Sequence, residues 1–316
     1  MTAAPHISVV MGVFNGAARL ARTMDSLLSQ EGVSFEVIAI DDGSTDETGA
    51  ILDDYAAKDR RVIVLHVDRC GLTRALIAGC ARARGEYIAR QDCGDVSPPG
   101  RLARQAAFLR DNPTIAMVSV GTRFFTPCGA PLYEISQTTD ELQAGLRGQT
   151  LQTIGGPSHH GATMFRKSAY DAVGGYRSPF RVAQDLDLWL RLAETASCAA
   201  IPELLYEASF ESGAIGHLRR EEQLQTARVI LDCAARRGRG ESDAPALEAW
   251  QKGVAHTTPQ IAHPGKAHDA RLHYFLAGLL RTRDPALARR YYRQSLRANF
   301  WQPRVWLRLI ALGRAR

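Results

Sequence analysis

The chain has 316 residues, of which 45% are hydrophobic and 23% are charged. This composition is typical of a folded protein and excludes disordered, fibrous and collagen-like chains. The length allows one large domain or two modest ones, and a chain of this size buries a core without disulfides.

The formal net charge of +6 conceals a division along the chain. Residues 1–212 contain 20 basic and 25 acidic side chains, whereas residues 213–316 contain 19 basic and 8 acidic ones. The two segments therefore differ in sign, at −5 and +11. This pattern argues against a uniformly basic nucleic-acid-binding protein and predicts two regions with different partners. We take 1–212 and 213–316 as the predicted domains.

The cysteines and the amino-terminal residues indicate where in the cell the protein is expected. Six cysteines are scattered without a C-x-x-C pair, which is typical of reduced thiols rather than of a metal or redox motif. The first residues lack a basic start, and the apolar stretch Ile7–Val13 is far too short to span a membrane. We therefore expect a soluble, cytoplasmic protein.

In the first part of the chain, apolar strands alternate with amphipathic helices. Helical spacing follows each of the first four strands, with Asn15 as the predicted cap of the first helix and Ser44–Glu47 as a capping box for the second. This alternation predicts an α/β fold with a mostly parallel sheet and right-handed connections. The predicted strands are Ile7–Val13, Phe35–Ile40, Val62–Val67, Glu86–Gln91 and Met117–Gly121.

From about Gly213 the predicted elements are all helical. Apolar faces recur at Leu224–Ala234, Leu272–Leu280, Leu287–Leu296 and Val305–Leu312. The last two resemble one helix pair of a tetratricopeptide-like unit, although such repeats need neighbours to bury their faces. We therefore predict a basic, helical C-terminal extension.

Carboxylates follow two of the predicted strands. Asp41 and Asp42 come directly after the second strand, and Asp92 and Asp95 follow the fourth. They can simply form turns, with Asp42 making an Asx turn. Because ligands of open α/β sheets bind beyond the carboxyl ends of the strands, these side chains can also bind a nucleoside and a Mg²⁺ or Mn²⁺ ion.

A further carboxylate pair stands in the first turn of a predicted helix, in the segment Gln184–Leu190. Asp185 and Asp187 can interact favourably with the dipole of that helix. Alternatively, Asp185 is a general base held near the edge of the sheet.

Five segments occur together in a fixed order, and their combination is more specific than any one of them. They are Val9–Gly16, Ile40–Asp46, Gly85–Asp92, Val173–Tyr176 and Ala183–Leu192. Over residues 6–210 the chain closely resembles the family 2 glycosyltransferases. The resemblance implies the GT-A fold, which is Rossmann-like with a mostly parallel sheet flanked by helices. It also implies an inverting transfer from a nucleotide-sugar, with UDP as the expected nucleotide.

The resemblance implies a role for several residues. Val10–Gly12 would line the nucleotide pocket, and Asp42 would bind the base. Asp92 matches the first carboxylate of the D-x-D motif, which engages the ribose and the metal-bound diphosphate, and Asp185 matches the catalytic base. His160 falls where the family often has a histidine, and a purely structural polar contact is an equal alternative for it.

Three positions depart from the family pattern. The third position of D-x-D is Gly94, followed by Asp95, so either Asp95 holds the metal with Asp92 or the dependence on a divalent metal is weakened. Gln184 replaces the usual glutamate before the base. Gly12 replaces a proline after the first strand, which we expect to loosen the loop under the nucleotide.

The expected reaction is a single in-line displacement in which Asp185 removes the proton of an acceptor hydroxyl. The sugar would be a hexose or an N-acetylhexosamine, and the acceptor a saccharide or a lipid-linked molecule in polysaccharide or glycolipid assembly. The Gly94 departure motivates an alternative, a catalytically silent nucleotide-sugar-binding module. A dehydrogenase is disfavoured because no G-x-G-x-x-G follows a strand.

The C-terminal extension allows two interpretations. It is a helical cap that completes the acceptor side of the cleft, or it docks peripherally on the anionic inner face of a membrane. The second interpretation rests on Phe300, Trp301 and Trp306, which are interleaved with arginines. Nucleic-acid binding is disfavoured because the sequence contains no motif that reads RNA or DNA.

Overall fold

The computed structural model describes residues 5–210, 220–255 and 265–314. The chain divides into two compact units, one of residues 1–123, 134–208 and 224–256, the other of residues 124–133, 209–223 and 257–316. This division differs from the boundary expected after residue 212. Most of α9 (Arg220–Gly238) and α10 (Ala244–Ala255) belong to the first unit, where Ile230 joins the hydrophobic core and Trp250 donates a hydrogen bond to the Pro179 carbonyl.

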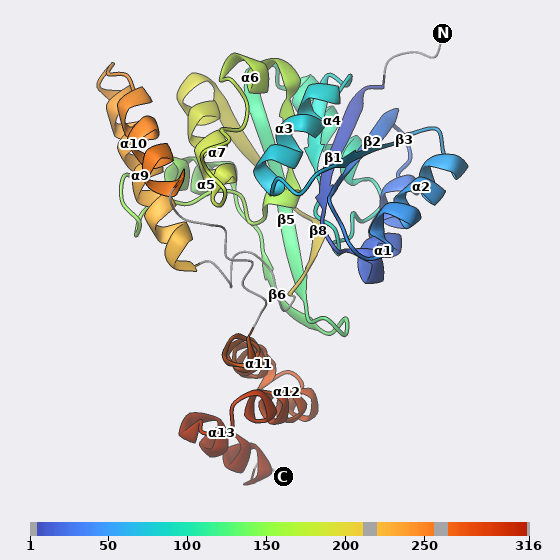
Figure 1. The fold of residues 1–316 in the computed structure, drawn as a ribbon, viewed down its shortest axis with the longest axis vertical. Helices are drawn as coiled ribbons and strands as arrows, with labels where there is room; N and C mark the ends of the chain where they lie inside the picture. Colours follow the sequence, from blue (N-terminus) through green and yellow to red (C-terminus); the bar gives the residue numbers. More distant parts are fainter. Residues whose placement is uncertain (1–4, 211–219, 256–264, 315–316) are drawn as a thin grey trace. The chain divides into compact units, whose positions relative to one another are not determined.

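The first five strands confirm the predicted strands to within a few residues, and three further strands complete the sheet. Among the described residues the sheet has eight strands in the order β3-β2-β1-β4-β7-β5-β6, with β8 paired to β5 (Figure 1). The strands are β1 Ile7–Val13, β2 Phe35–Asp42, β3 Val62–Val67, β4 Tyr87–Arg90, β5 Ile115–Phe125, β6 Pro131–Ile135, β7 Thr163–Arg166 and β8 Ser197–Ser209.

Parallel pairing joins β3, β2, β1 and β4, whereas β7 is antiparallel to both β4 and β5. The four parallel strands are therefore those that alternate with helices, as the sequence predicts. Helices flank the sheet, and the fold is a mostly parallel α/β fold. In the first unit the helices before α9 are α1 Ala17–Leu28, α2 Thr48–Lys58, α3 Leu72–Arg82, α4 Arg101–Asp111, α5 Thr139–Leu146, α6 Lys167–Ala172 and α7 Gln184–Thr195, with a short 3₁₀ helix η1 at His160–Ala162.

Helix α1 illustrates why these segments fold as they do. Its apolar residues recur at helical spacing, and Leu20, Met24 and Leu27 are buried. Asn15 does not cap this helix, so that prediction is wrong. Instead, its side-chain oxygen accepts the Thr45 amide at 2.8 Å, which joins the β1–α1 loop to the β2–α2 loop.

The predicted capping box of the second helix is also wrong. Helix α2 begins at Thr48, beyond the predicted motif, and the N-cap residue Glu47 makes no side-chain capping hydrogen bond. The carboxylate of Asp46 accepts the Thr48 amide at 3.0 Å and the Ala17 amide at 3.2 Å. Asp46 thus ties α1 to α2 at the carboxyl edge of the sheet.

The second unit contains helices α11 (Lys266–Leu280), α12 (Pro285–Ala298) and α13 (Pro303–Arg314). The Asp284 side chain accepts the Leu287 amide at 2.9 Å and caps α12, which begins with Pro285. Ser295 donates to the Ala270 carbonyl at 2.6 Å and links α12 to α11. None of the described helices has the length and apolar character needed to cross a bilayer.

An ion-pair network fixes α7 in the first unit. The Asp187 side chain is fully buried and accepts hydrogen bonds from Arg177 and Arg191. Arg177 also pairs with Asp243, just before α10, at 2.7 Å. Asp187 therefore serves the fold, and the first turn of α7 has one structural carboxylate beside Asp185.

We predict that Asp187→Asn lowers the free energy of unfolding by about 3–5 kcal/mol, because two guanidinium groups then lose their buried countercharge. Chemical denaturation measures this. The control is Asp54→Asn, which breaks the exposed pair with Lys58 and should cost less than about 1 kcal/mol. Equal effects of the two variants would contradict a structural role for Asp187.

Candidate functional site

The carboxyl ends of the parallel strands bring the sequence-predicted carboxylates to one edge of the sheet. Asp42 is the last residue of β2, and Asp92 follows β4 by two residues. Between these strands lies β1, where Val13 is paired with Asp41. The remaining groups of the site come from the segment before β7, from α7 and from β8.

Arg90, the last residue of β4, is the centre of this edge. Its side chain is fully buried, and its guanidinium donates to the Val10 carbonyl, to Asp92 Oδ1 at 2.8 Å and to His160 Nε2 at 3.3 Å. Burial, the largest single influence, raises the pKa of Asp92, but Arg90 together with His159, His160 and Arg101 outweighs it and keeps that pKa below its usual value. Asp92 is therefore ionised at neutral pH, with 31% of its side chain exposed.

A second buried guanidinium lies behind Asp92. Arg101, at the start of α4, donates to the carbonyl of Arg90 at 2.7 Å and to that of Gly161 at 2.5 Å, and lies over the ring of Tyr206 at 4.8 Å. Burial lowers its pKa to about 10, so it still carries a charge at neutral pH. Arg101 thereby links three parts of the chain: β4, β8 and the segment that precedes β7.

Tyr206 in β8 connects the two carboxylates that follow β4. Its hydroxyl donates to Asp95 Oδ2 at 2.8 Å and accepts the Asp92 amide at 3.2 Å. Burial, together with the negative charges of Asp95 and Asp92, raises the pKa of Tyr206 well above 10, which keeps the hydroxyl protonated. Tyr206 therefore fixes Asp95 beside Asp92.

Asp92, Asp95 and His159 form a cluster of possible metal ligands, with one donor atom of each within 4.8 Å of the others. His159 Nδ1 lies 3.8 Å from Asp92 Oδ2 and 3.7 Å from Asp95 Oδ2. The same nitrogen accepts the Gly161 amide at 3.1 Å, so this hydrogen bond has to break before Nδ1 can bind a cation. Two carboxylates and an imidazole nitrogen are chemically suited to a divalent cation.

Gly94 explains why the usual third carboxylate of D-x-D is missing. Its φ is +102°, a conformation that disfavours any side chain. The next residue, Asp95, has its carboxylate in the cluster with Asp92 and His159. The structure thus brings together the two carboxylates that the sequence predicted as metal ligands and adds a histidine that the sequence analysis missed.

Asp185 stands at the start of α7, immediately after a strained backbone position. Ala183, the residue that caps α7, has a φ of +53°, which is uncommon for a residue other than glycine. The Asp185 side chain accepts the Leu186 amide at 2.9 Å. Burial raises its pKa, and the negative charge of Asp92 raises it further. Asp185 and the Asp92 cluster therefore influence each other electrostatically.

Asp42 is buried and serves the loop that precedes α3. Its Oδ1 accepts the amides of Cys70 at 2.7 Å and of Gly71 at 3.1 Å, and its Oδ2 pairs with Arg69. The Arg69 guanidinium lies over the Phe14 ring at 3.5 Å. Asp42, Arg69 and Phe14 thus form one group of contacting side chains at the ends of β1, β2 and β3.

The side chain that bonds the turn after β2 is that of Asp41, so the prediction that Asp42 makes an Asx turn there is wrong. Asp41 Oδ1 accepts the Ser44 amide at 3.0 Å, and its Oδ2 lies 3.1 Å from His66 Nδ1. The other ring nitrogen of His66 lies 3.0 Å from Asp53 Oδ1. The two carboxylates, Asp53 foremost, raise the pKa of His66.

The remaining predicted residues, Val10, Gly12 and His160, lie in the interior of the first unit. The Val10 side chain is fully buried in the core and its carbonyl is bonded to Arg90, while Gly12 lies inside β1 rather than in a loop. A Cβ at Gly12 would lie 3.0 Å from the Leu72 side chain, so α3 packs tightly there. His160 Nε2 lies 2.7 Å from the Tyr176 hydroxyl, and burial and the charge of Arg90 lower its pKa well below 6.5.

Sequence reasoning missed His159, Arg69, Arg90, Arg101 and Tyr206. A signal existed for Arg90, because an arginine ends an otherwise apolar predicted strand. Arg101 and Tyr206 carry no comparable signal, since their roles arise from contacts between segments more than 100 residues apart.

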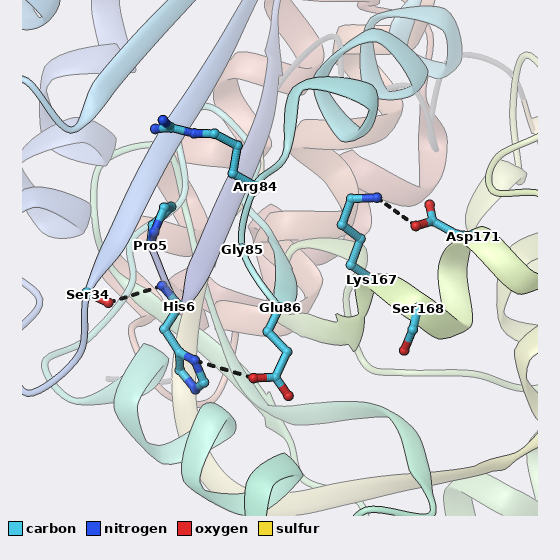
Figure 2. A pocket seen from close by; sticks show the side chains of 9 residues that line it. All are labelled: Pro5, His6, Ser34, Arg84, Gly85, Glu86, Lys167, Ser168 and Asp171. Carbon is cyan, nitrogen blue, oxygen red and sulfur yellow. Dashed lines mark hydrogen bonds and ion pairs between the residues drawn. The ribbon is translucent and has the colours of Figure 1, made fainter. Parts of the chain in front are cut away.

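An open pocket of about 810 Å³ lies at the opposite edge of the sheet, near the amino ends of β1 and β4 (Figure 2). Its charged side chains already have partners: Lys167 donates to Asp171 at 2.6 Å, and Glu86 lies 3.6 Å from His6. Arg84 pairs with Glu36, which does not line the pocket. The carboxyl edge, with its cluster of carboxylates, is therefore the stronger candidate for the functional site.

Known proteins resemble this chain in sequence and in fold. The family model "Glycosyl transferase family 2" matches residues 8–174. EpsE of Bacillus subtilis is 36% identical over 219 residues, which cover 68% of this chain and 76% of EpsE. The succinoglycan biosynthesis protein ExoO of Rhizobium meliloti is 40% identical over 101 residues, 32% of this chain and 28% of ExoO.

Among solved structures, TarS of S. aureus (residues 1–349) in complex with UDP-GlcNAc has a similar fold. The TM-score is 0.57 at 14% sequence identity, over 97% of this chain and 88% of that one.

We predict that His66 titrates above its ordinary pKa of 6.5 and that Asp53→Asn moves this pKa back toward 6.5. Because the raised pKa belongs to the folded state, the pair stabilises the protein below about pH 6.5, and this stability is lost as the pH rises through the pKa of the folded state. NMR titration of the His66 ring measures the shift. Asp140→Asn on α5 is the control, and an unchanged His66 pKa in Asp53→Asn would contradict the assignment.

Proposed function

The chain belongs to glycosyl transferase family 2, and we propose that it transfers a sugar from a nucleotide-diphosphate sugar to an acceptor hydroxyl with inversion at the anomeric carbon. Apart from the membership of this family, one observation supports the proposal. The Asp92 cluster, Asp185 and Asp42 lie at the carboxyl edge of one sheet, where open α/β folds bind their ligands.

We propose UDP as the nucleotide and a hexose or N-acetylhexosamine as the sugar. Support comes from the complexes of TarS with UDP and with UDP-GlcNAc, because TarS shares the fold of this chain. Asp42 would then accept a hydrogen bond from the base beside the Arg69–Phe14 pair. Val10 and Gly12 would contribute through the backbone of β1.

Asp185 is the proposed catalytic base. An ionised carboxylate can accept the proton of the acceptor hydroxyl as that oxygen attacks the anomeric carbon. Its raised pKa strengthens it as a base, provided the pH remains above that pKa. Activity should therefore fall on the acid side, beginning at a higher pH than for an aspartate with the ordinary pKa of 3.8.

Asp92, Asp95 and His159 would hold a divalent cation, Mn²⁺ or Mg²⁺. The cation would supply positive charge for the departing nucleoside diphosphate. Arg90 holds Asp92 in its ionised form, and Tyr206 orients Asp95. The mixture of oxygen and nitrogen donors favours Mn²⁺ over Mg²⁺.

The acceptor is proposed to be a saccharide or a lipid-linked molecule in polysaccharide assembly. ExoO, a succinoglycan biosynthesis protein, supports that setting. The proposed location is the cytoplasm, with access to the inner face of the membrane for a lipid-linked acceptor. A silent nucleotide-sugar-binding module remains the alternative that the following experiments distinguish.

Asp185→Asn should reduce sugar transfer by at least about 100-fold, because the amide cannot accept the proton, while UDP binds as it does to the native protein. Donor turnover and calorimetric UDP titration measure the two properties separately. The matched control is Asp171→Asn on α6, an exposed aspartate that should leave both unchanged. Full activity of the Asp185→Asn variant would exclude Asp185 as the base. If the native protein also shows no donor turnover, the silent nucleotide-sugar-binding module would be favoured.

Mn²⁺ should increase the thermal shift that UDP produces, and UDP should stabilise the protein more than GDP or dTDP. Asp95→Asn should abolish the increment due to Mn²⁺, and His159→Gln should reduce it, because each removes one metal ligand. Melting curves with each nucleotide, with and without the metal, provide the measurement. Asp140→Asn is the control. A Mn²⁺ increment that survives in Asp95→Asn would rule out this ligand set.

A further inference from the structure

Helix α13 and the residues just before it present an apolar surface that the described part of the chain leaves exposed. Val305 and Leu312 of α13 are buried, whereas the opposite face of the helix is exposed. On that face Leu307 is 67% exposed and Ile310 52%, and Trp301, just before the helix, is 86% exposed. We name these residues, together with Phe300 and Trp306, the aromatic face.

The aromatic face has a defined arrangement. Phe300 contacts the rings of Trp301 and Trp306 edge-on, with centroids 5.7 and 5.3 Å away. The indole of Trp306 donates to the Phe300 carbonyl at 3.2 Å, and the Trp301 amide donates to Asn299 at 3.2 Å. These contacts hold three large aromatic rings at the surface, whereas such side chains are usually buried for the most part.

The charge around the aromatic face has a single sign. Residues 285–316 contain eight arginines and no acidic residue. Arg304 and Arg308 are exposed and stand one turn apart on α13, on the flank of the apolar stripe, and Arg293 and Arg297 are exposed on α12. Long arginine side chains beside an apolar stripe can extend their charged ends toward a polar boundary while their stems contact apolar groups.

We propose that the aromatic face docks on an anionic lipid bilayer, with α13 lying in the headgroup region. The combination of one apolar face, interfacial tryptophans and flanking arginines is that of a helix that lies in the plane of a membrane surface. Each arginine is attracted to anionic headgroups, and the apolar side chains enter the boundary of the acyl chains. A second copy of this chain is a poorer occupant, because the two arginine-rich surfaces would repel each other.

This docking does not depend on sugar transfer, so it can fail or succeed separately from the proposed function. It would hold the catalytic unit close to acceptors that are attached to lipid.

Co-sedimentation with vesicles tests the proposal on the full chain. We expect binding to vesicles of equal parts phosphatidylglycerol and phosphatidylcholine at low salt, release at high salt, and little binding to phosphatidylcholine alone. Arg304→Gln with Arg308→Gln should lower the bound fraction severalfold. Trp301→Ser with Leu307→Ser and Ile310→Ser should abolish binding, and vesicles with brominated acyl chains should quench the native tryptophan fluorescence.

The controls separate docking from folding and from general charge. Arg110→Gln with Arg147→Gln removes two exposed arginines from the first unit and should leave binding unchanged. Circular dichroism and the melting temperature should match those of the native chain for every variant that is compared. No binding to anionic vesicles at low salt, binding that both sets of α13 variants leave intact, or a concentration-dependent dimer abolished by the apolar variants would each overturn the proposal.

Discussion

The rest of the site depends on two arginines that are buried at the carboxyl end of β4. Removing a guanidinium from water costs several kcal/mol, so Arg90 and Arg101 are tolerated only where acceptors surround them. Those acceptors come from β1 and the segments that follow β4 and precede β7, and Arg101 also lies over a ring of β8. The need to satisfy two buried charges therefore fixes segments that are far apart in the sequence. The exposed oxygens of Asp92 lie at the outer boundary of this assembly.

The electrostatics of the site follow from that arrangement. Arg90 keeps Asp92 ionised, and the charge of Asp92 in turn helps to raise the pKa of Asp185. Two neighbouring carboxylates thereby acquire different properties, one suited to a cation and the other to accepting a proton. Asp187, two residues from Asp185, pairs with arginines instead and anchors the helix that carries the proposed base. The first turn of α7 thus contains one structural carboxylate and the proposed base.

The sequence predicted most of what local patterns determine. Apolar runs located β1 to β4, because buried parallel strands are continuous in hydrophobicity, and β5 was found in part. Strands β6, β7 and β8 were not predicted from local patterns; in β8 the polar and small residues of Ser197–Ser209 give no clear alternation. Asp95 was anticipated as a metal ligand because it follows Gly94, whereas His159 and Tyr206 reach the cluster only through tertiary contacts. The helix caps were wrong for a related reason: the side chains of Asn15 and Ser44 join the β1–α1 and β2–α2 loops rather than capping helices.

The central claim is that the donor nucleotide binds along the carboxyl edge of the sheet, between Asp42 and the Asp92 cluster. A crystal structure of the protein soaked with UDP and Mn²⁺ tests it most directly. The account predicts the base beside Asp42 and Arg69, and the metal with Asp92, Asp95 and His159 among its ligands. Nucleotide density at the opposite edge, in the pocket between His6 and Lys167, or a metal bound without these three side chains, would contradict it.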